Sequence, residues 1–131
     1  MILLDTHAWL WFISNPEMLS KKARTEVTKA AKTQSLLISS ISAWEIALLV
    51  SRKRLELSMD AVEWISESQK LSFFRFIPVD NAIAIHSVNL PEPLHNDPAD
   101  RIIIATAILK KVDLVTKDNK IRNYAHVNTI W

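Results

Sequence analysis

The 131-residue chain contains no cysteine and no glycine. The lack of cysteine excludes disulfides, thiol nucleophiles and cysteine-ligated zinc, and it suits a reducing compartment. The lack of glycine excludes the P-loop and the GxGxxG dinucleotide loop, because both need glycine where the backbone approaches phosphate. Long hydrophobic runs are also missing, since the longest, IIIATAIL, is too short to span a bilayer. We therefore expect a soluble, cytoplasmic protein with no membrane association.

Length and composition favour a single domain that spans residues 1–131. Apolar residues make up 49% of the chain, which is enough for one sizeable core. Sixteen basic residues against fourteen acidic ones give a formal charge of +2. This mild excess permits a polyanionic partner such as a nucleic acid without requiring one.

Short apolar runs alternate with segments that have the length and spacing of helices. Strands are expected at residues 1–5, 35–39, 74–79, 113–117 and 126–131, with helices between the first four strands, one of them over residues 41–54. Ser20, Ser39 or Ser40, and Asp60 are expected to cap the helices that follow them. This alternation predicts an α/β fold with a largely parallel, about five-stranded sheet covered by helices on both faces. Ligands in such folds bind at the carboxyl ends of the strands, so the residues at those ends are the first candidates for a site.

Four acidic residues fall at or near these predicted strand ends. Asp5 ends the first strand, Asp118 follows the fourth, Asp100 opens the helix before the fourth, and Glu45 lies early in the helix after the second. Each acid alone has an ordinary explanation as a helix cap, a turn residue or a salt-bridge partner. Convergence of all four would raise their pKa values unless a cation held them ionised. An all-oxygen site selects Mg²⁺ or Mn²⁺, whose chemistry is phosphodiester hydrolysis by an activated water.

Four segments, LLDTHAWLW, SAWE, HNDPADRIIIATA and LVTKD, together resemble the PIN domain of VapC-type toxins from prokaryotic toxin–antitoxin pairs. The resemblance covers essentially the whole chain, in order. It implies a PIN-like three-layer α/β/α sandwich and a Mg²⁺- or Mn²⁺-dependent endoribonuclease acting on RNA. It further implies inhibition by a VapB-like antitoxin protein and assembly as a homodimer. The catalytic and metal-binding residues implied are Asp5, Glu45, Asp100 and Asp118.

The stretch NDPAD contains a second aspartate with a different expected role. Asp97 fits the N-cap and Pro98 the first position of the following helix. We therefore expect Asp97 mainly to cap this helix, with a possible outer-shell role at the metal, while Asp100 mainly holds the metal.

Several further residues near the strand ends are secondary candidates. Thr6 and Thr116 have the chemistry to hydrogen-bond a metal-held water or a phosphate, although threonines beside turns commonly satisfy backbone groups. Arg101 is a candidate phosphate contact, with a salt bridge as the alternative. His7 and His95 are expected to make ordinary structural hydrogen bonds.

Basic and aromatic residues suggest places for partners. The clusters Arg52–Arg54 and Lys117, Lys120 and Arg122 have the charge to follow an RNA backbone, although basic helix ends are usually solvated. Five tryptophans in so short a chain suggest an exposed apolar patch for a second subunit or an antitoxin segment, although most such residues lie in cores.

Three other functions compete with the nuclease. A receiver-like phosphoacceptor domain needs an aspartate after the third strand, which Asp80 supplies, but it leaves Glu45 and Asp100 unexplained. A dehalogenase-like phosphatase needs a second aspartate at position 7, which is histidine. A non-catalytic RNA- or protein-binding module remains open, because the sequence alone does not exclude it.

Overall fold

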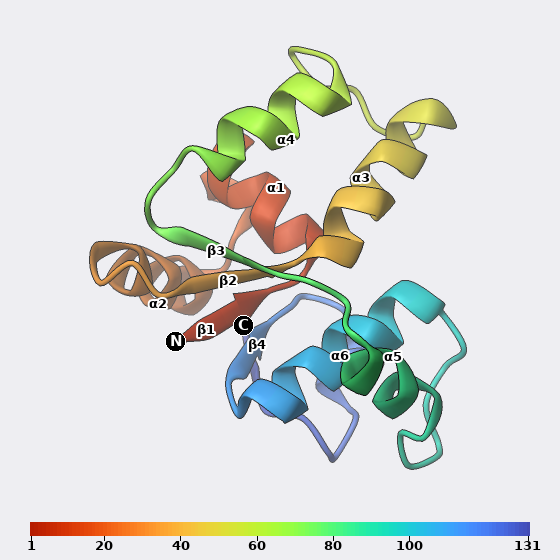
Figure 1. The fold of residues 1–131 in the computed structure, drawn as a ribbon. Coiled ribbons are helices and arrows are strands. Elements are labelled where there is room, and N and C mark those ends of the chain that lie inside the picture. The colour runs from red at the N-terminus through yellow and green to blue at the C-terminus, as the bar shows by residue number, and fades with distance from the viewer.

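The structure is a computed structural model that describes residues 1–131. Its centre is a sheet of five parallel strands (Figure 1). The strands lie in the order β3-β2-β1-β4-β5. Their bounds are β1 (Ile2–Leu4), β2 (Leu36–Ser39), β3 (Phe74–Ile77), β4 (Asp113–Val115) and β5 (Thr129–Ile130). The predicted α/β class and parallel sheet are confirmed, and each strand is shorter than expected, the fifth most of all.

Helices connect the strands, and polar side chains set where most of them begin. The helices are α1 (Thr6–Ser14), the 3₁₀ turn η1 (Pro16–Met18), α2 (Lys21–Lys32), α3 (Ser40–Ser51), α4 (Ala61–Gln69), α5 (Asn81–Val88), α6 (Pro98–Lys110) and α7 (Asn119–Arg122). The predicted caps Ser20, Ser39 and Asp60 each accept a hydrogen bond from a backbone N–H of the first turn. The prediction missed α7, and it extended α3 too far, since Arg52–Arg54 lie beyond its end.

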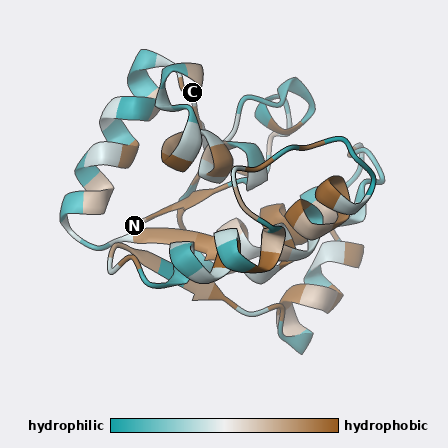
Figure 2. Ribbon diagram, turned by 90° about the horizontal axis from the view of Figure 1, so that it is seen from above, coloured by the Kyte–Doolittle hydropathy of each residue, from teal (hydrophilic) through white to brown (hydrophobic).

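Side chains alternate along the strands and build a separate apolar core on each face of the sheet. Ile2 and Leu4 of β1 pack with residues of α1, α2 and α4, whereas Leu3 packs with residues of α6 and α7. The strands are mainly apolar, while the helices carry polar residues on their outer sides (Figure 2). The predicted three-layer α/β/α sandwich is therefore confirmed.

Three non-glycine residues adopt the left-handed backbone conformation that glycine favours. They are Gln34, Lys53 and Lys111, with φ between 54° and 58°. Lys111 ends α6 with φ 57° and ψ 48°, the position where a glycine usually closes a helix. A chain without glycine thus closes this helix at a conformational cost.

The connections leave the central strands in opposite directions. After β1 the chain crosses through α1 and α2 to β2, whereas after β4 it continues through α7 to β5 on the other side. Because β1 and β4 are neighbours, their carboxyl ends form the topological switch point at which parallel sheets bind ligands. Asp5 and Thr6 follow β1 there, and Thr116 and Asp118 follow β4. No helix combines the length and apolar character needed to cross a bilayer.

Candidate active site

A polar pocket of about 450 Å³ lies at this switch point. It draws its lining from the start of α1, from α3, from the start of α6 and from the segment between β4 and α7. The nine lining residues are Asp5, Thr6, His7, Trp11, Glu45, Asp97, Asp100, Lys117 and Asp118. The structure thus brings together the four acids singled out in the sequence, although they lie on different elements.

Three aspartates of the pocket cap helices and line the pocket at the same time. Oδ1 of Asp5 accepts from the Ala8 N–H at 2.8 Å, and Oδ1 of Asp118 accepts from the Lys120 N–H at 2.8 Å. Asp97, as predicted, caps α6 by accepting from the Asp100 N–H at 3.0 Å. One carboxylate oxygen suffices for a cap, so capping and a role in the pocket are compatible rather than alternatives.

Asp5 is the most buried acid of the pocket. Burial raises its pKa from 3.8 to about 6, against the lowering effects of a Thr116 hydrogen bond and the Ala8 N–H. Thr116 is fully buried, and its hydroxyl also accepts from the Asp118 N–H at 3.1 Å. Thr116 therefore links the residues that follow β1 and β4, which matches the alternative of satisfying a backbone group, and it does not line the pocket.

Glu45 is held by the start of α1. The Thr6 hydroxyl, itself 2.9 Å from the Ser42 hydroxyl, donates to the Glu45 carboxylate. Burial raises the pKa of Glu45, and the hydrogen bond from Thr6 partly offsets that rise. Thr6 thus orients the one acid that reaches the pocket from the middle of a helix.

Asp100 is paired with a histidine. Oδ2 of Asp100 lies 2.7 Å from Nε2 of His95, and both side chains are about four-fifths buried, with 21% and 18% exposed. Burial raises the pKa of Asp100, while the His95 hydrogen bond lowers it. Sequence reasoning gave His95 an ordinary structural role and missed its contact with a candidate catalytic acid. The only local signal was its place five residues before Asp100.

The acids of the pocket act on one another electrostatically. Asp100 raises the pKa of both Asp5 and Glu45, and Asp97 and Asp118 raise that of Asp100. A set of carboxylates this close together is costly to keep ionised without a cation. The donor set is all oxygen, which fits Mg²⁺ or Mn²⁺. In the conformation described here each carboxylate faces a protein donor, and no three acids are drawn together around one point.

Arg101, a candidate phosphate contact, does not line this pocket. Its Nε donates to the Ser87 carbonyl at 3.0 Å, and Nη1 donates to the carbonyls of Leu94 and His95 at 3.4 and 3.3 Å. Glu92 lies 3.5 Å away, which matches the alternative of a weak salt bridge. With 11% of its side chain exposed, Arg101 holds the loop that carries His95.

Asp80, the residue that favoured a receiver-like domain, lies outside the pocket. It caps α5 by accepting from the Ile83 N–H at 2.9 Å, beyond the edge strand β3. Strand β2 separates β3 from β1. A phosphoacceptor centre that combines Asp5 with Asp80 is therefore not formed.

The tryptophans are mainly core residues. Trp9 and Trp64 are buried and pack against each other in a tilted arrangement with a centroid distance of 5.0 Å, and Trp11 is half-buried. Trp44, on α3, is the exposed one, with 55% of its surface accessible. The five tryptophans thus do not gather into a single exposed patch.

The fold and the site define a class of protein: a parallel α/β/α sandwich with a carboxylate-lined pocket at its switch point. Residues 2–127 match the PIN domain family. The chain is 33% identical to the ribonuclease VapC22 of Mycobacterium tuberculosis, with 99% of this chain and 98% of that protein covered.

Solved structures share the fold. One is VapBC2 from Rickettsia felis bound to a DNA fragment from its promoter, with a TM-score of 0.71, 19% identity and coverage of 98% of this chain and 97% of that chain. Another is a toxin–antitoxin complex from Klebsiella pneumoniae, with a TM-score of 0.62, 23% identity and coverage of 97% and 95%. The chain belongs to the PIN domain family, and within that family to its VapC-type members.

Proposed function

We propose that this protein is a Mg²⁺- or Mn²⁺-dependent endoribonuclease and the toxin of a VapBC-type toxin–antitoxin pair. The observation that carries the proposal is the meeting of Asp5, Glu45, Asp100 and Asp118 in one open pocket at the switch point. The relationship to a protein named as a ribonuclease supports RNA as the substrate.

The four acids are assigned to hold the metal, and the residues around them to orient these acids. When bound, a divalent ion supplies a water nucleophile at neutral pH and neutralises charge on the phosphate. Thr116 fixes Asp5 relative to the Asp118 backbone, Thr6 fixes Glu45, and His95 fixes Asp100. Asp97 caps α6 and adds negative charge at the pocket rim.

The same reasoning extends to partners and location. We propose a VapB-like antitoxin as the protein partner, since solved relatives of this fold include toxin–antitoxin complexes. A homodimer, a single functional domain over residues 1–131 and a cytoplasmic location complete the proposal.

Cleavage of total cellular RNA, with 5′ ends mapped by sequencing, tests the proposal. We expect discrete cuts with Mg²⁺ or Mn²⁺, none with chelator, and none with Asp100→Asn or Glu45→Gln. Asp80→Asn is the matched control, because Asp80 caps a helix with the same geometry but lies outside the pocket.

Cuts that persist in Asp100→Asn and Glu45→Gln would refute the assignment of these acids. If the wild-type protein binds RNA or the antitoxin but cleaves no RNA, the non-catalytic binding module is favoured instead.

A further inference from the structure

The polar pocket that contains the four acids is called the acid pocket here. One of its walls is formed by an aromatic ring and a lysine that the proposed mechanism does not use. The Nζ of Lys117 lies over one face of the Trp11 ring, 5.8 Å from its centre, in a cation–π contact. The exposed His7 ring lies 5.6 Å from Trp11 at an angle of 50°. Trp131 supports Trp11 at 6.0 Å. The Trp11 indole is thus held in place by its neighbours, at the edge of the acid pocket.

Lys117 is the only lysine or arginine among the residues that line the acid pocket. Its side chain is exposed, and it takes part in no ion pair of the structure, in contrast to Lys70 and Arg101. An ammonium group that has no carboxylate partner and lies beside four carboxylates is well placed to bind a phosphate that approaches them.

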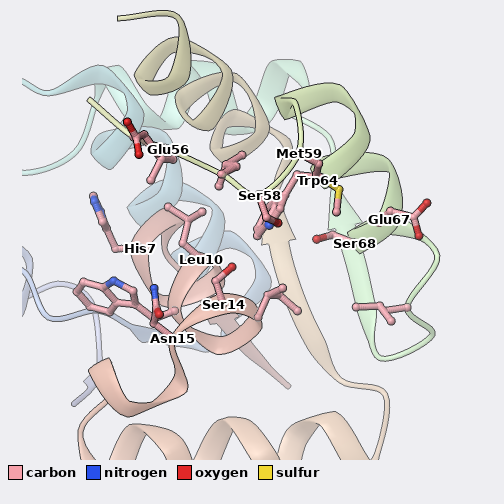
Figure 3. A pocket seen from close by; sticks show the side chains of 15 residues that line it. His7, Leu10, Ser14, Asn15, Glu56, Ser58, Met59, Trp64, Glu67 and Ser68 are labelled. Atoms are coloured by element: carbon pink, nitrogen blue, oxygen red, sulfur yellow. The ribbon is translucent and has the colours of Figure 1, made fainter. Parts of the chain in front are cut away.

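A second cavity, of about 580 Å³, adjoins the acid pocket, and Figure 3 shows the side chains that line this second cavity. The two share His7 and Trp11. Leu10 and Trp64 give the second cavity apolar walls, as Figure 3 shows, and Glu56 and Glu67 add negative charge to it. Such a surface accepts an uncharged flat group and repels phosphate. A base is therefore expected at Trp11 and its phosphate at Lys117.

We propose that Trp11, His7 and Lys117 bind one unpaired nucleotide of the RNA next to the scissile bond. The base stacks on the Trp11 indole, with His7 beside it, and the Lys117 ammonium contacts the phosphate of that nucleotide. Stacking of bases on aromatic side chains is the general means of holding single strands without strict sequence preference. The inference rests on the proposed function, because it assumes that the substrate is RNA.

Binding measured without cleavage tests it. In the Asp100→Asn background, fluorescence anisotropy compares two labelled probes, a uridine dodecamer and a dodecamer of abasic ribose phosphates. We expect Trp11→Leu to weaken binding of the uridine probe by about fivefold to a hundredfold. It should leave the abasic probe unaffected, and Trp11→Phe should restore much of the loss.

Lys117→Ala should weaken the binding of both probes. It should also reduce the slope of log K against log salt by about 0.7, the value for one phosphate contact on a single strand. Lys117→Arg should retain the contact. Trp44→Leu and Lys29→Ala are the matched controls, since both residues are exposed and lie outside the acid pocket.

Other outcomes would overturn the inference. If Trp11→Leu weakens the binding of both probes equally, or has the same effect on binding as Trp44→Leu, no base stacks on Trp11. If Trp11→Leu releases the antitoxin but leaves RNA binding unchanged, this face binds protein instead. Metal-dependent RNA cleavage by the wild-type protein, measured in parallel, separates these failures from failure of the proposed function.

Discussion

Replacement of Asp5 by asparagine should stabilise the metal-free protein while it abolishes RNA cleavage. Asn keeps the Oδ1 atom that accepts from the Ala8 N–H, so the cap of α1 survives. It removes a carboxylate whose charge is disfavoured by burial, as the rise of its pKa from 3.8 to about 6 records. A residue that lowers stability for the sake of function is typical of an active site.

The magnitude follows from proton linkage. The folded protein favours protonated Asp5, so the contribution of Asp5 to wild-type stability falls as pH rises from 3.8 through about 6 and is level above that range. At about 1.4 kcal/mol per pH unit, the advantage of Asp5→Asn grows from about 0.5 kcal/mol at pH 4 to about 3 kcal/mol at pH 7.5.

Urea unfolding in EDTA, followed by tryptophan fluorescence at both pH values, measures this difference. Asp80→Asn should change stability by less than about 0.5 kcal/mol at either pH, because Asp80 is exposed. Addition of Mg²⁺ should stabilise the wild type and leave Asp5→Asn unchanged. A variant less stable than the wild type at pH 7.5, or an advantage that does not vary with pH, would refute the reasoning.

Three further predictions concern neighbouring residues. His95→Ala should lower kcat by about tenfold to a hundredfold with little change in KM, because the ring orients Asp100; an unchanged kcat in steady-state cleavage assays would contradict this role. Thr116→Val should lower the free energy of unfolding by about 2 kcal/mol in urea, because it removes a buried hydroxyl that is hydrogen-bonded on two sides. Lys111→Gly should raise that free energy by up to about 1 kcal/mol, whereas Lys110→Gly inside α6 should lower it by a similar amount. A loss of stability in Lys111→Gly would show that the left-handed residue carries no strain.

Local patterns in the sequence predicted the elements well. Alternating apolar runs located all five strands, and polar residues before helical segments located the caps at Ser20, Ser39, Asp60 and Asp97. These features depend on a few adjacent residues, so the local sequence is sufficient. Helix α7 was missed because four residues are too few to show a period.

The candidate acids were also foreseen, but through two kinds of reasoning. Asp5 follows β1 directly and Asp118 comes three residues after β4, so their place at the carboxyl edge follows from a parallel sheet. Glu45 and Asp100 lie within helices, and the resemblance to VapC-type PIN domains supported their inclusion. Periodicity alone would have left Glu45 on an apolar helix without a partner.

The sequence by itself determined the short-range features of this protein: its elements, their caps and the chemical character of its acids. Only the tertiary structure decided the strand order that makes β1 and β4 neighbours. That order brings Thr116 to Asp5, while the folding of the loop around Arg101 brings His95 to Asp100. Such contacts join residues whose proximity depends on long-range packing, which local periodicity does not encode. For the same reason Arg101 proved to hold a loop, and Lys117 proved to stand beside Trp11 at the edge of the acids.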